Sequence, residues 1–564
     1  MDICTLREFA TDDMIIRILA KERGKLASKG CGTRDIVNGR GGHPEGELSI
    51  ADLTPPHSLW IRLPAGRKPR KADHGIEKWT RRKKIDTARV YGTMVKYRDS
   101  SPDLPWVRNL ESFIREIRSI VDGSTPFRLE SPSILPKYKK DVKRPDGTVA
   151  HIYRPICVYS DIRTKVVLAL ACKYMLAMFD RCFHSRMFFM RNARKDAAGN
   201  WSTPDYRDCV KIASAFRKDH KWENIYVGEC DIQKFYDIFN HDCILDCLDR
   251  LFGIRASLAG CGTEVFRQLR RVMEMYLDSF DFPGHVLKLN GDAQFWAREV
   301  SSRATADDPH PVCLFDWVSR ESFLKCGCYG SGEELDSAIA AGKLGIPQGG
   351  SLSGIIVNVV MNVVDTDIVS PKDPGRFFAR YCDDILLMHT DREKCAAYLE
   401  SYRKALAEQR LVWHDFVDVG GSKKDGSPKI GSPFWNAKSK SVFLWGRGER
   451  NSSDWIAFVG YEMRYTGEIR IRKDKVTGEF NRISRTYHRV VNSKEKDKEA
   501  LLERFGELPG KLKDYELATH DGFTRNQGRR LDKYVRLKAR KASRIIHARI
   551  PKGLATYADT LGGK

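Results

Sequence analysis

The sequence has no long apolar segment, because no run approaches the roughly 18 residues that a membrane-spanning helix needs. Its opening residues, MDICTLREFATDD, are polar and acidic, so a signal peptide is not expected there. The 15 cysteines include no CxxC pair, which argues against a disulfide framework. No internal repeat or low-complexity tract is present. These absences predict a globular cytoplasmic protein with reduced thiols.

Acidic residues are outnumbered by basic ones. The 564 residues include 97 Lys and Arg against 74 Asp and Glu, which gives a formal charge of +23. A surplus of this size favours a polyanionic partner such as a nucleic acid, and no basic amphipathic anchor indicates the alternative of an anionic membrane. Residues 67–84 and 525–552 concentrate the basic side chains. We expect both segments to contact a phosphate backbone, with a solvated surface as the alternative.

The most informative stretch of the sequence is residues 376–390, RFFARYCDDILLMHT, which carries two adjacent aspartates. Two apolar runs flank Cys382, Asp383 and Asp384, which predicts a strand, a tight turn and a second strand. Adjacent carboxylates at the tip of a buried hairpin repel each other and lose hydration, so a cation is expected beside them. Magnesium fits this position. A polar turn without a ligand is the simpler alternative.

A third carboxylate lies upstream, in residues 224–240. The alternating positions 225–230 predict a strand that ends in Asp231. Phe235 and Tyr236 follow closely, and an aromatic ring five residues after a metal-binding Asp can pack beneath an incoming sugar. Core packing is the alternative role for both rings.

Residues 345–365, GIPQGGSLSGIIVNVVMNVVD, form a glycine-rich loop followed by an apolar run. The glycines allow a ligand to approach the backbone closely, and Gln348 offers donors and an acceptor toward a base or sugar. Asn358, Asn362 and Asp365 are spaced as one polar stripe of a helix, which predicts a helix despite the β-branched residues.

A basic hairpin is predicted around the turn signal Asp146-Gly147, with Lys143 before it and Arg154 after it. Such a hairpin can reach over a triphosphate, because Lys acts as a point charge and Arg grips phosphate oxygens. By contrast, Cys230, His241, Cys243 and Cys247 are not expected to bind zinc. His241 instead begins a helix that Asn240 caps and that Gly253 is expected to end.

Residues from about 126 to 470 together resemble the fingers and palm of reverse transcriptases, particularly the bacterial ones. The matching motifs are Asp231-Ile232 with Tyr236, Pro347-Gln348-Gly349 with Ser353, Asn358 and Asp365 at group II intron spacing, the YxDD box Tyr381-Cys382-Asp383-Asp384, the nucleotide-gripping Arg154-Pro155-Ile156, the later palm lysine Lys438, and the primer-grip segment from Phe458 to Tyr461.

The resemblance implies an α+β right-hand polymerase fold with fingers, a palm and a helical basic thumb. The expected divisions are an N-terminal extension at 1–105, fingers and palm at 106–490 with an insertion between about 253 and 340, and a basic helical region at 491–564. Two Mg²⁺ ions, or Mn²⁺ in their place, are implied at the catalytic residues Asp231, Asp383 and Asp384. Nucleotide-binding roles are implied for Lys143, Arg154, Phe235, Tyr236, Gln348, Gly349 and Lys438, and a primer grip for Phe458, Val459, Gly460 and Tyr461.

The subclass of reverse transcriptase that the chain resembles is inferred from the motifs that its sequence lacks. The chain has no HNH-type endonuclease tail, no RNase H-like segment and no NAxxH signature of retron enzymes. Val476-Thr477-Gly478 matches a retron VTG motif, but we expect it in a hairpin turn. The chain therefore looks most like the defence-associated, formerly unknown-group, bacterial reverse transcriptases, which implies cDNA synthesis from deoxynucleotides on a non-coding RNA template. A retron or group II intron-type enzyme is the nearest alternative.

Two further alternatives stay open. Ser353-Gly354 with two spaced asparagines resembles RNA-dependent RNA polymerases, although Tyr236 argues against them because its ring would exclude a 2′-hydroxyl. A nucleic-acid scaffold with a decayed site is the third possibility, and the presence of all three carboxylates argues against it.

Overall fold

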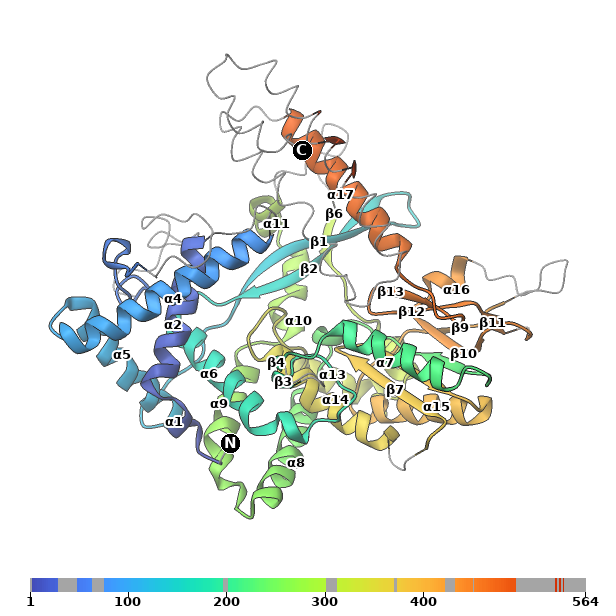
Figure 1. Cartoon of the computed structure of the whole chain (residues 1–564), viewed down its shortest axis with the longest axis horizontal. Coiled ribbons are helices and arrows are strands. Elements are labelled where there is room, and N and C mark those ends of the chain that lie inside the picture. Colours follow the sequence, from blue (N-terminus) through green and yellow to red (C-terminus); the bar gives the residue numbers. More distant parts are fainter. Residues whose placement is uncertain are drawn as a thin grey trace.

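The computed structural model describes residues 3–28, 48–62, 76–195, 201–300, 312–369, 373–420, 432–449 and 451–492, together with residues 533–534, 537–538 and 541. Helices and strands are both abundant and largely occupy separate regions (Figure 1), so the predicted α+β class is confirmed. Residues 67–75 and most of 525–552 lie outside the described residues, and their contact with phosphates stays a prediction. Within the described part, no helix combines the length and apolar character needed to cross a bilayer.

A six-stranded sheet carries the predicted hairpin. Its order is β11 (Ser452–Ser453), β10 (Ser439–Trp445), β5 (Tyr226–Glu229), β8 (Asp384–His389) and β7 (Arg376–Tyr381), and β9 (Phe416–Val417) pairs with β10. β5 runs antiparallel to both of its neighbours, β8 and β10. The carboxyl end of β5 therefore lies beside the first residues of β8 and of β10.

The two faces of this sheet belong to different cores because side chains alternate along each strand. Ile225 and Val227 share a core with α7 (Tyr206–Asp219). Tyr226 faces the larger core, which contains residues of α8 (His241–Ala259), α14 (Ser353–Val369) and α15 (Arg392–Glu408). At Gly228 a Cβ atom would lie 3.1 Å from Leu399 of α15, so glycine allows this helix to pack closely on β5.

The basic hairpin predicted above is present as β1 (Ser133–Lys143) and β2 (Val149–Val158), with Gly147 of its turn at φ +85°. A third strand, β6 (Val312–Phe315), joins β2 in parallel. β6 comes from the segment that was expected to be an insertion, so this segment contributes to the fingers sheet. The helices of the segment between about 253 and 340 are α9 (Arg267–Asp278), α10 (Phe282–His285), α11 (Ala293–Val300), α12 (Arg320–Lys325) and α13 (Gly332–Ala340).

Helices from the first part of the chain pack beside this sheet, at the left of Figure 1. They are α1 (Leu6–Phe9), α2 (Asp12–Ser28), α4 (Ile76–Ser100), α5 (Pro105–Asp122) and α6 (Ile162–Phe179). Their apolar faces belong to the same core as α8, α9 and α14. The described N-terminal residues are therefore built into the body of the molecule.

The expected end of α8 and the expected start of the C-terminal helical region are both wrong. Asn240 caps α8 as predicted, but the helix continues through Gly253 to Ala259 and ends at Gly260, which adopts a left-handed conformation at φ +66°. After the small sheet of β12 (Trp455–Phe458), β13 (Tyr461–Arg464) and β14 (Ile469–Ile471), the chain enters α17 (Lys473–Asn492). Val476-Thr477-Gly478 therefore lies in a helix and not in a hairpin turn, and the helical region begins about 20 residues earlier than expected.

The remaining short elements are β3 (Arg194–Lys195), which pairs with β4 (Trp201–Ser202), and α16 (Ser432–Asn436).

Candidate active site

The predicted hairpin at residues 376–389 is confirmed, and its turn is tight. Tyr381 and Asp384 form the last pair of β7 and β8, which leaves Cys382 and Asp383 as a two-residue turn. Cys382 has φ +60°, in the left-handed region that non-glycine residues rarely adopt. Its carbonyl oxygen accepts a hydrogen bond from Nη1 of Arg380 at 2.9 Å. A side chain of the same hairpin therefore holds the turn.

Asp231 lies just beyond the end of β5, where the antiparallel pairing brings it beside this turn. Its backbone N–H donates to Oγ of Ser439 at 3.0 Å, and its carbonyl accepts from the N–H of His414 at 3.0 Å. Its Oδ2 lies 2.9 Å from Nζ of Lys438 and 3.9 Å from Nε2 of His414. Lys438, predicted from its place in the sequence, thus contacts the first carboxylate directly.

The three carboxylates lie within electrostatic reach of one another. Desolvation, followed by repulsion from Asp231, raises the pKa of Asp383. Desolvation by the surrounding chain, together with the charges of Asp383 and Asp231, raises the pKa of Asp384 to about 7, although its side chain reaches the surface. Burial would lower the pKa of Lys438, but attraction to Asp231 and to the other two carboxylates raises it above its usual value. The structure therefore brings these four residues together.

The chemistry of the carboxylates fits a divalent cation. Hard cations such as Mg²⁺ prefer carboxylate oxygens. Desolvation first, and then repulsion from the neighbouring carboxylates, raises the pKa of Asp383 and of Asp384, and a bound cation would offset both effects. Within the described ranges, no three His, Cys, Asp or Glu side chains already converge as a metal site. His241, set aside above as a zinc ligand, places Nε2 2.8 Å from the carbonyl oxygen of Gly345 instead.

The two aromatic residues after Asp231 differ in position. Phe235 is 4% exposed and packs against Phe239, with ring centroids 4.7 Å apart, so it lies in the core and not at an open surface. Tyr236 is half-buried, and its hydroxyl lies 3.5 Å from Sγ of Cys382 in the turn. Burial raises the pKa of Tyr236, which keeps the phenol neutral. Tyr236 is therefore the ring that borders the turn at Cys382 and Asp383.

The glycine-rich loop is fastened to both the fingers and the palm. Gly345 and Gly349 adopt φ +93° and +99°, which glycine tolerates best. The carbonyl of Gln348 accepts from the N–H of Cys157 in β2 at 2.8 Å, and its Nε2 donates to Oδ1 of Asp237 at 2.6 Å. Asp237 was not among the predicted residues.

The fingers hairpin brings basic groups toward the palm. Arg154 is exposed on β2. Burial, followed by the charges of Lys234 and Arg154, lowers the pKa of Lys139 to about 8, so these three basic groups lie near one another. Lys234 also forms an ion pair with Asp316 at 2.7 Å. Lys143 is nearer the tip of the hairpin, and no contact within the described residues links it to the carboxylates.

The predicted primer-grip residues form the β12–β13 hairpin. Phe458 and Tyr461 are its last pair and both are buried. Val459 and Gly460 make the turn at φ +42° and +90°, and the β-branched Val459 is strained in this region. The carbonyl of Gly460 accepts from the N–H of Arg472 at 3.0 Å. The turn is thus a fixed and strained feature, which is typical of functional loops.

Tyr206, at the start of α7, connects the β12–β13 hairpin with the β7–β8 hairpin. Its ring centroid lies 5.9 Å from that of Tyr381 and 6.3 Å from that of Tyr461. No local pattern predicts this link, because the three rings are far apart along the chain.

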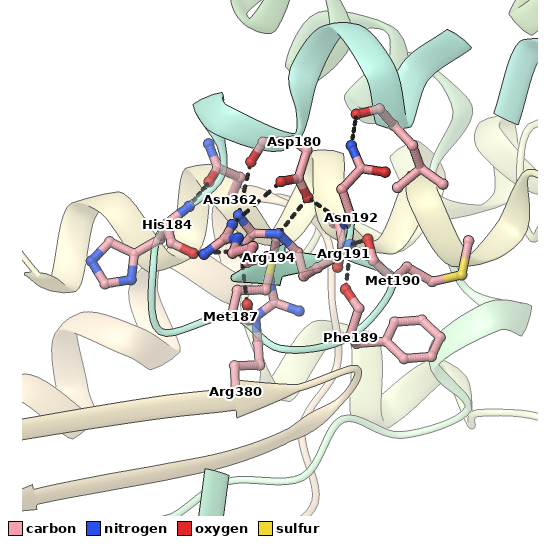
Figure 2. A network of polar contacts seen from close by, with 12 residues as sticks. Asp180, His184, Met187, Phe189, Met190, Arg191, Asn192, Arg194, Asn362 and Arg380 are labelled. Carbon is pink, nitrogen blue, oxygen red and sulfur yellow. Dashed lines mark hydrogen bonds and ion pairs between the residues drawn. The ribbon is translucent and has the colours of Figure 1, made fainter. Parts of the chain in front are cut away.

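The polar stripe predicted on α14 is confirmed as helical, and its residues contact the loop at 180–194 and the β7–β8 hairpin. Asn358 donates to the carbonyls of Phe189 and Met190. Asn362 accepts from the N–H of His184, and Asp365 accepts from the guanidinium of Arg380. Within the loop, the buried Arg191 donates to Asp180 at 2.7 Å, and Met187 contacts Arg380 (Figure 2). Sequence reasoning identified the stripe but not its partner Arg380, whose burial no local pattern indicates.

The comparisons with known proteins agree with this geometry. Residues 319–415 match the family model described as "Reverse transcriptase (RNA-dependent DNA polymerase)". This match contains Gln348, Asp383 and Asp384, while Asp231 and Lys438 lie outside it. No curated protein matches the chain.

Solved structures that are similar to the chain include two telomerases. The telomerase from Candida albicans in complex with a fragment of telomeric RNA is 13% identical, with a TM-score of 0.28, over 82% of this chain and 70% of that chain. The apo telomerase from Candida tropicalis is 11% identical, with a TM-score of 0.32, over 84% of this chain and 70% of that chain. Likenesses of this size carry no argument about function. The chain has an α+β fold, and its residues 319–415 match the reverse transcriptase family.

Proposed function

We propose that the chain is an RNA-directed DNA polymerase that extends a primer with deoxynucleoside triphosphates. The observation that carries this proposal is the meeting of Asp231, from the end of β5, with Asp383 and Asp384 at the β7–β8 turn. The family match supports it because two of these carboxylates lie in the matched residues.

Mg²⁺ is the cofactor that this proposal requires, with Mn²⁺ as a substitute. Asp231 and Asp383 would hold two ions, and Asp384 would complete the negative site. Such ions, when bound, lower the pKa of a primer 3′-hydroxyl and stabilise the charge that develops on the transferred phosphoryl group. The donor set fits them, because all three side chains offer carboxylate oxygens.

The other residues act on the substrates. Lys438 stays protonated beside Asp231 and holds this carboxylate at the end of β5. Arg154 and Lys139 supply positive charge for the triphosphate from the fingers hairpin. Tyr236 borders the sugar, and the turn at Val459 and Gly460 contacts the primer strand.

The biological role that we propose rests on the resemblance to defence-associated bacterial enzymes. It is cDNA synthesis in the cytoplasm on a structured non-coding RNA, in the service of antiphage defence. The formal charge of +23 supports an RNA partner. Sequencing of the RNA that copurifies with the chain, and of any DNA that it makes, tests this role. A random mixture of cellular RNAs would contradict a dedicated template.

The polymerase activity itself is tested with the full chain, a primed RNA template, deoxynucleotides and Mg²⁺. We expect Asp231→Asn and Asp383→Asn each to lower incorporation by about a thousandfold, since each change removes roughly 4 kcal/mol of transition-state stabilisation. Asp246→Asn, at an exposed position on α8, is the matched control and should leave incorporation unchanged. Near-normal incorporation by both catalytic variants, or none by the unsubstituted chain, would contradict the proposal.

A further inference from the structure

Trp222, in the loop between α7 and β5, presents its ring to solvent. It is 88% exposed, more than any other large hydrophobic side chain of the described residues. Nζ of Lys221 lies 4.7 Å from the centroid of the indole, in the position of a cation–π contact. Lys221 is itself exposed. The loop therefore offers an open aromatic face with a positive charge beside it.

The backbone of this loop is held in place by Arg217 of α7. Its guanidinium donates to the carbonyl of Lys221 at 3.2 Å and to the carbonyl of Glu223 at 3.0 Å. The N–H of Glu223 also donates to the carbonyl of His220 at 3.1 Å, which closes a turn. A ring on a fixed backbone loses little conformational freedom when a ligand covers it.

Arg217 also joins this loop to a second aromatic residue. Its Nε donates to the carbonyl of Tyr465 at 3.1 Å, and Cζ of Arg447 lies 5.9 Å from the centroid of the Tyr465 ring. Arg447 makes two hydrogen bonds to Asp454. The side chain of Arg447 is 65% exposed and that of Asp454 only 25%, so the cation is the outer partner of the pair.

We refer to Lys221, Trp222, Arg447 and Tyr465 as the Trp222 surface, and it lies away from the candidate active site. Trp222 precedes β5, whose opposite end leads to Asp231. Tyr465 follows β13, whose opposite end adjoins the β12–β13 turn. A ligand on the Trp222 surface is therefore separated from the carboxylates by the length of these strands.

The residue types of the Trp222 surface favour a nucleic acid over a protein. The centre of a protein interface buries a cluster of apolar side chains. In α7, the loop to β5 and residues 451–472, all of them described, no large hydrophobic side chain other than Trp222 is exposed. Rings beside cations instead suit a single strand, because bases stack on the rings and phosphates bind the cations. The formal charge of +23 favours the same partner.

We propose that the Trp222 surface binds a single-stranded segment of the RNA partner outside the active site. A base stacks on the open face of Trp222, and Lys221 and Arg447 contact phosphates of the same segment. This inference rests on the proposed polymerase function, because the RNA is the molecule that also supplies the template. The contact holds the RNA on the chain while its template region moves past the carboxylates.

The test measures binding of a labelled oligouridine of about 12 nucleotides to the full chain by fluorescence anisotropy. An excess of unlabelled primer–template with a short overhang first fills the active site. Trp222→Ala should weaken oligouridine binding by about five- to tenfold, because it removes the stacking ring. Trp222→Phe keeps a ring and should retain most of the affinity. Trp201→Ala, at a position 68% exposed on β4, is the matched control and should bind normally.

The salt dependence tests the phosphate contact separately. Lys221→Gln should reduce the slope of log Kd against log salt by about 0.7, the value for one phosphate contact on a single strand. Trp222→Ala should leave this slope unchanged, because stacking releases no counterion. An unchanged slope in Lys221→Gln would remove Lys221 from the proposed contact and overturn the inference in this form.

Primer extension separates this inference from the proposed function. Extension of the same primer–template should be normal in Trp222→Ala, since this residue lies away from the carboxylates. Equal affinity of Trp222→Ala and the unsubstituted chain for oligouridine would overturn the inference and leave the polymerase function intact. Failure of the unsubstituted chain to bind oligouridine beside the primer–template would overturn it as well. Oligouridine binding without any nucleotide incorporation would contradict the proposed function instead.

Discussion

Arg380 donates to both carboxylate oxygens of Asp365, with Nη2 2.7 Å from Oδ2 and Nε 3.0 Å from each oxygen. Both side chains are completely buried. Asp365 belongs to α14, whereas Arg380 comes two residues before Cys382, whose carbonyl accepts from Nη1 of the same guanidinium. The ion pair thus connects a helix of the core to the turn that carries Asp383.

We predict that Arg380→Met destabilises the fold by about 3–5 kcal/mol, because it leaves the carboxylate of Asp365 buried without a partner. Replacing both residues, as Arg380→Met with Asp365→Leu, should recover most of this loss, since no buried charge remains. Nucleotide incorporation should stay low in the double variant, because the carbonyl of Cys382 still lacks its donor. Urea unfolding and primer extension measure the two effects. Full activity of the double variant would show that the turn does not need Arg380.

Asp384→Asn should stabilise the chain in metal-free buffer at pH 8. The carboxyl ionises near 3.8 when unfolded and near 7 when folded, so between these values the folded state binds more protons. Stability therefore rises as the pH falls from 7 to 4, and the cost of the ionised group is fully present above pH 7. Removing the charge should raise Tm by about 2 °C at pH 8 and by nothing at pH 4.

Mg²⁺ provides the second half of this test. Bound cations would neutralise the same charge, so saturating Mg²⁺ should shrink the difference in Tm between Asp384→Asn and the unsubstituted chain. Asp246→Asn serves as the control, because its side chain is exposed on α8. Equal Tm values for Asp384→Asn and the unsubstituted chain at pH 8 without metal would show that the ionised carboxylate of Asp384 does not destabilise the fold.

The fold of the candidate active site was predictable because its signals are local. The hairpin at 376–389 has apolar strands on both sides of a polar turn, and the alternation before Asp231 marks a strand that ends two residues before this carboxylate. The polar stripe on α14 could be found for the same reason. Each of these patterns repeats within a few residues, so a single sequence is enough to detect it.

The wrong predictions from the sequence share a physical cause, which is packing against residues far away in the chain. Gly253 was expected to end α8, but a glycine costs a helix only about 1 kcal/mol, and Ala256 beyond it is buried. Val476 lies in a helix because it and Phe480 pack against the core that Ile225 and Val227 share with α7. The burial of Phe235 also depends on tertiary neighbours. None of these contacts can be read from adjacent residues.

The basic segments should make RNA binding depend steeply on salt. Log Kd plotted against log salt should have a slope of several units, because each phosphate contact releases a counterion. Reversing Arg525, Arg529, Arg530 and Lys533 together to Glu should weaken binding to all sequences alike. Lys211→Glu on α7, where Lys211 already pairs with Asp208, is the control and should change little. A flat salt dependence would assign these charges to solvated surface.

The last prediction concerns selection of the sugar by Tyr236. Its ring is half-buried beside the catalytic turn, and its hydroxyl lies 3.5 Å from Sγ of Cys382. If the ring packs against C2′ of the incoming nucleotide, a ribose 2′-hydroxyl overlaps it and ribonucleotides are excluded by steric contact. Tyr236→Ala should then raise the kcat/KM ratio of ribonucleotide to deoxynucleotide by at least about tenfold.

Tyr236→Phe separates the ring from its hydroxyl. It keeps the bulk that excludes ribose but loses the contact with Cys382, so its sugar preference should match that of the unsubstituted chain. Deoxynucleotide use should fall only modestly in Tyr236→Ala, because the carboxylates and the fingers bases are unchanged. If the unsubstituted chain already prefers ribonucleotides, or if Tyr236→Ala leaves the ratio unchanged, Tyr236 does not select the sugar. An RNA-dependent RNA polymerase then becomes the better description, because its metal-binding carboxylates would be the same and only the sugar would differ.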